Sequence, residues 1–346
     1  MLVFYLRSSS IGTYDQCPHK YFLSYVLGEQ ESPRQKTVMG SMYHKIMENL
    51  ALGRKAELAG KKSYVSEDFG RIKLPIDLDK MTMLSYDLYK KKHSEFDWYE
   101  LDFKGRYGII NHLGDLKSWV PLGLGMVDPR KLNVKDVEVQ FDIPIEHDWA
   151  QYEYKLFGQT HKGNLSLKGT IDLVVEDDII QIIDWKTGQR KNWVTGEAKE
   201  YDDFHKDKQL LLYYYVAHHL YPGKPIMMNL VWVNSGGPYT IYFDESDYVR
   251  AENMIKESFI KIKNQEKAEL IRPHDFCRFC DFNKTYYEDP KTFKDGNPMN
   301  KCYHIRQEIY QIGMTKTVEK YVKNQGAHLR QYSEGGGRDA KFDKNS

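Results

Sequence analysis

The sequence has few cysteines, no long apolar run and almost no net charge. Only four of its 346 residues are cysteine, too few to hold together a secreted domain of this length by disulfides. No stretch reaches the ~18 consecutive apolar residues of a membrane-spanning helix, and the N-terminal apolar segment is too short for a signal peptide. We therefore expect a cytoplasmic protein in a reducing compartment, with no membrane partner.

The charges nearly cancel, since 50 Lys and Arg stand against 49 Asp and Glu, for a formal net charge of +1. This balance excludes a histone-like polycation but leaves room for a local basic surface that binds nucleic acid. The sequence also lacks the G-x-x-x-x-G-K-[ST] motif of a phosphate-binding loop. Any ATP-driven unwinding would therefore have to come from a partner.

Hydrophobic periodicity predicts helices at both ends of the chain and a mixed α/β core between them. Strands are predicted over 137–145, 165–176, 179–185, 226–233 and 239–243. Helices are predicted over 37–52, 78–98, 204–221, 245–267 and 303–324, with two short helices meeting at Cys17. Residues 61–80 and 104–133 are predicted to be irregular. The helical part then spans about 8–100 and the α/β core about 134–267.

Two aspartates occupy strand positions where apolar residues are expected. Asp172 lies within the apolar run 171–175, and Asp184 follows a stretch that is almost entirely apolar. Buried carboxylates are costly unless they are paired or bound to metal. If the two strands form a hairpin, Asp172 can face Asp184, while Lys186 shares a strand face with Asp184. Such carboxylates bind Mg²⁺ or Mn²⁺, and the lysine can orient an attacking water; the alternative is that both aspartates end strands and cap turns.

Weaker candidates lie on the predicted helices and on one loop. His44 and Glu48 share a helix face, and an imidazole is a fair ligand for Mn²⁺, although a lone helical histidine often only packs. Gln209 and Tyr213 share a face of a helix that is mostly core. A basic segment with an aromatic residue follows the third strand and suits phosphate contact and base stacking, or is simply a solvated loop. It contains Lys186, Arg190, Lys191 and Trp193.

The placement of the cysteines indicates a thiolate site. Cys277 and Cys280 form a C-x-x-C pair, which brings two thiolates onto one metal or cluster. Together with Cys17 and Cys302 they use every cysteine in the chain. Such a site would join the N-terminal helices to the cysteine-bearing segment 272–325. Disulfides and inert buried thiols are the alternatives.

Taken in order, these motifs resemble the PD-(D/E)XK nuclease superfamily, in its RecB-like, AddB-type iron–sulfur branch, which is similar to the CRISPR adaptation exonucleases. The resemblance covers most of the chain. It rests on Cys17-Pro18 with Tyr21-Phe22, Gly40-x-x-x-His44-x-x-x-Glu48, Gly169-x-x-Asp172, Asp184-x-Lys186-Thr187-Gly188, Gln209-x-x-x-Tyr213, and Arg272-Pro273 with Cys277-x-x-Cys280. It implies a restriction-endonuclease-like core of αβββαβ order, whose N- and C-terminal helical elements are joined by a metal-cluster staple.

The resemblance also implies roles for single residues. The catalytic metal, Mg²⁺ or Mn²⁺, would be held by His44, Asp172, Asp184 and the carbonyl of Trp185. Lys186 would serve the attacking water. Gln209 and Tyr213 would line the site and contact DNA. A 4Fe–4S cluster would be held by Cys17, Cys277, Cys280 and Cys302; four thiolates also suit structural Zn²⁺, which stays open as an alternative.

The expected protein is a metal-dependent DNA exonuclease of recombination, repair or phage DNA metabolism, acting on DNA that is single-stranded or has a free end. A helicase or recombinase is an expected partner. The alternatives are a non-catalytic DNA-binding or scaffold subunit of a helicase–nuclease complex and a structure-specific endonuclease. Residues 1–325 are predicted to form one nuclease domain, and residues 326–346 a disordered tail.

Overall fold

The computed structural model describes residues 1–94, 96, 102–103, 109–110, 112–191, 196–265, 277, 280–283, 293–294, 297–298 and 300–322. It contains two compact units built from separate stretches of chain. The terminal unit comprises Met1–Ser32, Asp142–Lys168 and Met254–Ser346, and the central unit comprises Pro33–Phe141 and Gly169–Asn253. A single domain over 1–325 stays a prediction, and the predicted tail 326–346 lies outside the described residues.

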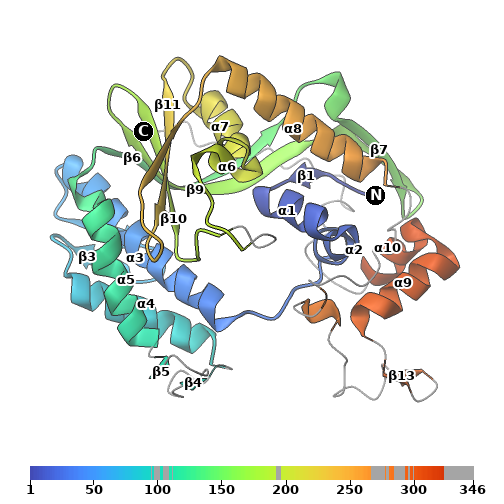
Figure 1. The fold of residues 1–346 in the computed structure, drawn as a ribbon, viewed down its shortest axis with the longest axis horizontal. Helices are drawn as coiled ribbons and strands as arrows, with labels where there is room; N and C mark the ends of the chain where they lie inside the picture. The colour runs from blue at the N-terminus through green and yellow to red at the C-terminus, as the bar shows by residue number, and fades with distance from the viewer. Residues whose placement is uncertain are drawn as a thin grey trace. The chain divides into compact units, whose positions relative to one another are not determined.

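The central unit is built on a mixed sheet (Figure 1). Strand β9 pairs antiparallel with β10, β10 pairs parallel with β11, and β11 pairs antiparallel with β12, while β6 lies on the other side of β9. The strands are β6 (Val134–Pro144), β9 (Ser166–Glu176), β10 (Ile180–Lys186), β11 (Ile226–Trp232) and β12 (Tyr239–Tyr242). Every residue of β11 is buried, which explains its nearly continuous apolar sequence. The predicted mixed sheet is confirmed.

Helices pack on this sheet. The longest, α3, packs against α4 and α5, as Figure 1 shows. Alternate sheet residues, among them Leu173, Trp185 and Val231, share one apolar core with Met42 and Met47 of α3. The next residue along β10, Lys186, instead reaches α7, which packs on β11. The helices are α3 (Gln35–Leu58), α4 (Leu78–Lys92), α5 (His112–Met126), η3 (Pro129–Lys131), α6 (Tyr201–His205), α7 (Lys208–Leu220) and α8 (Glu245–Lys263), the last of which continues into the terminal unit.

Two segments of the central unit predicted to be irregular are ordered, so those predictions were wrong. Residues 61–80 contain the hairpin of β2 (Ser63–Ser66) and β3 (Gly70–Lys73). Its strands are short and only one of their eight residues is buried, so they carry no apolar alternation to recognise. Residues 104–133 contain α5, and the two-residue strands β4 (Asp102–Phe103) and β5 (Ile109–Ile110) pair just before it.

Helix α5 was missed because its composition disfavours a helix. It has Pro121 in its interior and several glycines, residues with the poorest helix propensities. Packing offsets that cost: a Cβ at Gly123 would lie 1.9 Å from the Tyr43 hydroxyl oxygen and 3.0 Å from Met47 Cε. Only a glycine lets α5 approach α3 this closely. Gly123 therefore lowers the helix propensity of the sequence, but it allows the packing that stabilises the helix in the fold.

Replacing Gly123 with alanine should therefore destabilise the protein by about 1–3 kcal/mol, the usual cost of overpacking a core. Gly125, in the same helix, is the matched control, because a Cβ there meets nothing within 4 Å. Gly125→Ala should stabilise by roughly 0.5–1 kcal/mol, since alanine loses less backbone entropy in a helix. Urea unfolding of the two variants measures the difference; equal stability would contradict the packing argument.

The terminal unit carries the helices at both ends of the chain. Its strand β1 (Tyr5–Leu6) pairs parallel with Ser166 and Leu167 at the start of β9. The predicted pair of short helices meeting at Cys17 is confirmed, with Cys17 as the N-cap of the second. The unit contains α1 (Ser8–Gln16), α2 (Pro18–Tyr21), η1 (Phe22–Val26), η4 (Asp148–Ala150), β7 (Gln151–Leu156), β8 (Gln159–Asn164), η6 (Asp281–Asn283), β13 (Phe293–Lys294), β14 (Asn297–Pro298), α9 (Lys301–Ile312) and α10 (Met314–Val322).

Two predicted single helices are each divided in two. The helix expected over 303–324 breaks at Gly313, whose φ of 82° is left-handed and ends α9. The helix expected over 204–221 is α6 followed by α7. The Asp207 side chain accepts a hydrogen bond from the backbone N–H of Gln209 and so starts a new helix. No helix among the described residues has the length and hydropathy of a membrane span.

Candidate active site

The predicted hairpin places both aspartates where β9 and β10 separate. The last paired residues of the ladder are Leu173 and Ile183, so Asp172 and Asp184 follow immediately on either strand. In place of a ladder bond, the backbone N–H of Trp185 donates to Asp172 Oδ2 at 3.1 Å. The Asp184 side chain is 6% exposed and that of Asp172 14%. The end of the ladder between β9 and β10 therefore brings two nearly buried carboxylates together.

Helix α3 adds His44 to this place. Its Nδ1 lies 3.2 Å from Asp172 Oδ2. One turn earlier, Gly40 lets the helix approach the end of β10, because a Cβ at that position would come within 2.8 Å of the Thr187 hydroxyl oxygen. The spacing Gly40-x-x-x-His44 thus has a steric reason. The glycine lets α3 lie close to the end of β10, and this brings the imidazole one turn later next to Asp172.

The structure adds one acidic residue that the sequence did not indicate. Glu138 of β6 joins His44 and Asp172 in a set whose ligand atoms all lie within 4.8 Å of one another. The apolar alternation of Val137 and Val139 gave no sign of this. The backbone at Glu138 is left-handed, with φ 48°, which is uncommon for a residue other than glycine and interrupts the alternation. No pattern in the sequence announces that interruption.

Lys186 connects the second aspartate to α7. Its Nζ lies 2.7 Å from Asp184 Oδ2 and donates to Gln209 Oε1 at 3.1 Å. Tyr213, one turn after Gln209, is 8% exposed and meets the Phe141 ring edge-to-face at 6.2 Å. The predicted shared face of Gln209 and Tyr213 thus lies against the Asp184–Lys186 pair.

His44 and Asp172 shift each other's pKa. Burial alone would lower the pKa of His44, but the charge and the hydrogen bond of Asp172 outweigh it and raise that pKa. Burial alone would raise the pKa of Asp172, but the neighbouring His44 lowers it below the usual range. Each member of the pair therefore favours the charged form of the other.

The carboxyl groups of Asp184 and Glu138 are buried with too little positive charge nearby to keep their pKa values low. Burial, with the charge of Asp172, raises the pKa of Asp184 despite the ammonium of Lys186. Burial by itself lowers the pKa of Lys186, and Asp184 reverses this, so that the lysine stays charged. Burial and the charges of Asp172 and Glu48 raise the pKa of Glu138 to about 7. An added cation would relieve this crowding.

A pocket of about 480 Å³ opens beside these groups. Its walls come from α3, α4, β6, the middle of β9 and the residue that follows β10. The lining residues are Thr37, Gly40, Ser41, His44, Lys45, Glu48, Tyr89, Glu138, Asp172 and Thr187. This is a volume typical of small-molecule sites.

The site suits a hard divalent cation. It offers carboxylate oxygens and one imidazole, the donors that Mg²⁺ and Mn²⁺ accept. Asp184 Oδ2 is buried and accepts no well-aligned hydrogen bond from a described residue, although the Lys186 ammonium is close. A buried carboxylate oxygen in that state is costly, and a bound cation would satisfy it. The residues present therefore fit the metal that the sequence analysis expected.

The four cysteines all lie in the terminal unit. The N–H of Cys280 donates to the carbonyl of Cys277 at 3.2 Å, and His19 Nε2 lies 3.0 Å from the carbonyl oxygen of Cys302. Burial, followed by the charges of Cys17 and the other two thiols, raises the pKa of Cys302 to about 12. Among the described residues no three cysteine sulfurs lie within 4.8 Å of one another.

The basic segment after β10 is described only in part. Arg190 lies over the Tyr239 ring at 4.8 Å and pairs with Glu200 at 3.3 Å, so its guanidinium is held within the protein. Trp193 lies outside the described residues, as do Arg272 and Pro273 of the cysteine motif.

Comparison with known proteins defines the class of this fold and site. The PD-(D/E)XK nuclease superfamily matches the sequence over residues 8–108 and 115–285. The chain therefore belongs to this superfamily, and its membership supports a hydrolytic nuclease. The iron–sulfur branch within the superfamily stays a prediction.

Solved structures give only distant likenesses. A protein from Eubacterium rectale described as a proposed exonuclease is 13% identical, with 80% of this chain and 88% of that chain covered and a TM-score of 0.41. The protein SSO0001 is 20% identical, with 60% and 80% covered and a TM-score of 0.25. No curated protein matches the sequence significantly. The family assignment thus rests on the superfamily match.

Proposed function

We propose that the protein is a divalent-metal-dependent deoxyribonuclease that removes nucleotides from DNA ends. One observation carries the proposal: the donors of His44, Asp172 and Glu138 converge within 4.8 Å, next to the Asp184–Lys186 pair on the adjoining strand. A cation held by these donors, with the charged lysine next to it, would support hydrolysis of a phosphodiester.

The cation, Mg²⁺ or Mn²⁺, would be held by His44, Asp172 and Asp184 with the carbonyl of Trp185, and Glu138 would add a further carboxylate to this set. When bound, it lowers the pKa of a water and neutralises charge on the phosphoryl group. Asp172 keeps the imidazole of His44 turned towards the site through the 3.2 Å contact. That orientation leaves little freedom to lose on metal binding.

Lys186 would orient the attacking water and offset the charge that develops on the phosphate. Its position is fixed from two sides, by Asp184 at 2.7 Å and by Gln209 at 3.1 Å. Gln209 and Tyr213 then line the side of the site formed by α7, where we propose that they contact DNA. A charged donor held in this way needs no reorganisation during the reaction.

Digestion of end-labelled single- and double-stranded DNA with Mg²⁺ or Mn²⁺, and with EDTA, tests the proposal. We expect the label to be released as short products only with the metal. Cleavage of closed circular single-stranded DNA would identify an endonuclease instead. Binding without cleavage of any of these substrates would favour the non-catalytic DNA-binding subunit and overturn the proposal.

We further propose that Cys17, Cys277, Cys280 and Cys302 hold a 4Fe–4S cluster that joins the N- and C-terminal helical elements of the terminal unit. The C-x-x-C pair and two further cysteines lie in the same unit and could supply the four thiolates that such a cluster needs.

Anaerobic purification with metal analysis tests this assignment. We expect brown protein with absorbance near ~400 nm from iron–thiolate bonds, lost in Cys302→Ser. A colourless preparation with stoichiometric zinc would establish the zinc alternative.

Because the sequence has no phosphate-binding loop, we propose that a helicase partner supplies unwound ends in recombination, repair or phage DNA metabolism.

A further inference from the structure

We infer that Lys45 is a phosphate anchor: its ammonium binds a phosphate of the DNA strand other than the one at the cation site. The inference rests on the proposed function and deepens it by naming how the strand is held in the pocket. Lys45 directly follows the candidate metal ligand His44 in α3, but neither the nuclease motifs nor the cation site gives it a role.

The pocket has little positive charge of its own to offer a DNA strand. Among the described lining residues, Lys45 alone is positively charged at any physiological pH. Three others are the carboxylates Glu48, Glu138 and Asp172, which repel a phosphodiester. The charge of Lys45 also reaches the cation site, because burial and the nearby carboxylates raise the pKa of Glu138 while Lys45 acts against that rise.

Lys45 is held in place by a residue of the same helix. Its Nζ lies 2.6 Å from Glu48 Oε2, one turn further along α3, and both residues line the pocket. The Lys45 side chain is only 17% exposed. A lysine that is already ordered in this way loses little conformational entropy when it binds a phosphate.

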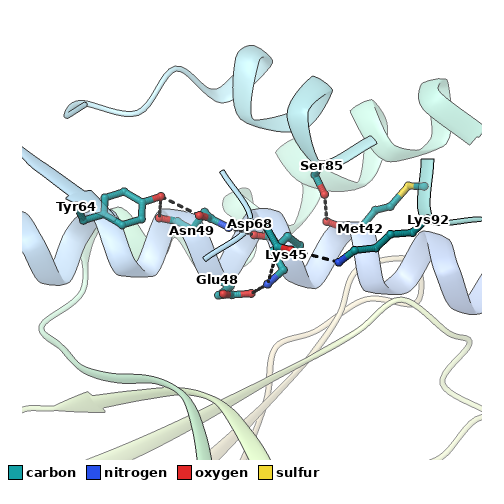
Figure 2. A network of polar contacts seen from close by, with 8 residues as sticks. All are labelled: Met42, Lys45, Glu48, Asn49, Tyr64, Asp68, Ser85 and Lys92. Carbon is teal, nitrogen blue, oxygen red and sulfur yellow. Dashed lines mark hydrogen bonds and ion pairs between the residues drawn. The ribbon is translucent and has the colours of Figure 1, made fainter. Parts of the chain in front are cut away.

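The other partner of Lys45 is replaceable. Figure 2 shows the Asp68 carboxylate between two lysines, 2.9 Å from Lys45 Nζ and 3.2 Å from Lys92 Nζ. An ammonium has three N–H groups, and Glu48 and Asp68 occupy two of them on Lys45. A phosphate can take the third N–H, or it can replace Asp68, which would still be paired with Lys92.

The segment of α3 that carries Lys45 is fixed from both sides by neighbouring elements, as Figure 2 also shows. The Ser85 hydroxyl of α4 donates to the carbonyl of Met42 at 3.0 Å. The Tyr64 hydroxyl of β2 donates to the carbonyl of Asn49 at 3.1 Å. These two carbonyls lie three residues before and four residues after Lys45, so the backbone under the anchor has little freedom to shift.

Lys45 and Lys186 lie on different elements and suit different tasks. Lys186 of β10 is held beside the cation site by Asp184 and Gln209, where it can act on the reacting phosphate. Lys45 can hold the same strand at a second point, and two points orient a flexible chain better than one. A phosphate contact carries no sequence information, so the anchor predicts binding that is independent of base sequence.

Fluorescence anisotropy with a labelled single-stranded oligonucleotide in EDTA measures binding without cleavage. Lys45→Met should weaken binding about ten- to hundredfold, the range for loss of one charged hydrogen bond. The slope of log affinity against log salt should become shallower by about 0.7. Lys45→Gln can still donate to Glu48 and should show both changes, whereas Lys45→Arg should keep the slope. Lys55→Met is the matched control, because Lys55 lies on the same helix and pairs with Asp136 outside the pocket.

Oligonucleotides with a single uncharged methylphosphonate linkage show whether the contact is direct. One such replacement near the DNA end should weaken binding by the wild type. The same replacement should have no further effect on Lys45→Met, because that protein has already lost the contact. Circular dichroism verifies that each variant is folded.

Three results would overturn the phosphate anchor. The first is an unchanged salt slope in folded Lys45→Met and Lys45→Gln proteins. The second is an equal change of slope in Lys55→Met, since any charge on α3 would then have this effect. The third is a set of methylphosphonate replacements that all weaken the wild type and Lys45→Met equally. A wild type that binds DNA through Lys45 but cleaves none supports the anchor and overturns the nuclease proposal; a wild type that cleaves DNA without any dependence on Lys45 does the reverse.

Discussion

Lys186→Met should reduce DNA cleavage by about 10²–10³-fold while Mn²⁺ binding is retained. Removal of one preorganised donor at a developing charge has an effect of this size. The Lys186 ammonium contacts Asp184 and Gln209, and as a cation without a lone pair it cannot itself bind the metal. Methionine keeps the length and the apolar stem of the side chain, so the change falls mainly on the charge.

This variant leaves Asp184 buried without its cation partner, which destabilises proteins by about 3–5 kcal/mol. The double variant Asp184→Asn/Lys186→Met removes both charges and should recover much of that loss in the melting temperature without recovering cleavage. Lys224→Met is the matched control, since Lys224 pairs with Glu176 at 2.8 Å away from the pocket. Wild-type cleavage rates in folded Lys186→Met protein would exclude a catalytic role for the lysine.

The strand pair that carries the site could be read from the sequence, and its geometry could be anticipated. Asp172 and Asp184 stand out because each interrupts an apolar run, and a hairpin leaves few ways to arrange them. His44 was a weaker prediction, because one histidine on a helix does not say what it faces. The 3.2 Å contact with Asp172 depends on how α3 packs, and that is decided by Gly40 and Thr187, which are far apart in the sequence.

Glu138 could not have been found in this way. Sequence patterns assume a regular strand, in which Glu138 would lie on the face opposite Val137 and Val139. The left-handed φ of 48° breaks that rule, and such a conformation persists only where the surrounding structure enforces it. The same limit applies to α5. Its glycines and proline disfavour a helix, and the packing of Gly123 on Tyr43 that offsets this cost cannot be seen in the sequence.

Glu138→Gln should weaken Mn²⁺ binding at least about tenfold, the lower end of the losses seen when groups around a metal are removed. The same variant should melt at a higher temperature than the wild type when metal is absent. An amide carries no charge, so it avoids both the cost of burying a carboxylate and the repulsion from Asp172 and Glu48, which together raise the pKa of Glu138 to about 7. The two effects have opposite signs because one carboxylate is unfavourable without the cation and useful with it.

Asp172→Asn provides the contrast. It should also lose Mn²⁺ affinity, but its metal-free protein should melt at a lower temperature, because Asp172 accepts a hydrogen bond from the Trp185 N–H and pairs with His44. Asp136→Asn serves as the control: it lies on β6 two residues before Glu138 and pairs with Lys55 outside the pocket. Neither its Mn²⁺ affinity nor its response to added metal should change.

Thermal melts with and without Mn²⁺, together with electron paramagnetic resonance of the free ion, separate these cases. A ligand at 100 times its Kd stabilises the folded state by about 2.7 kcal/mol, and a tenfold loss of affinity removes about 1.4 kcal/mol of that. If Glu138→Gln keeps the full Mn²⁺-induced shift, Glu138 is not a metal donor. If it melts below the wild type without metal, its carboxylate is held by a favourable contact, and the charge crowding inferred for the pocket is wrong.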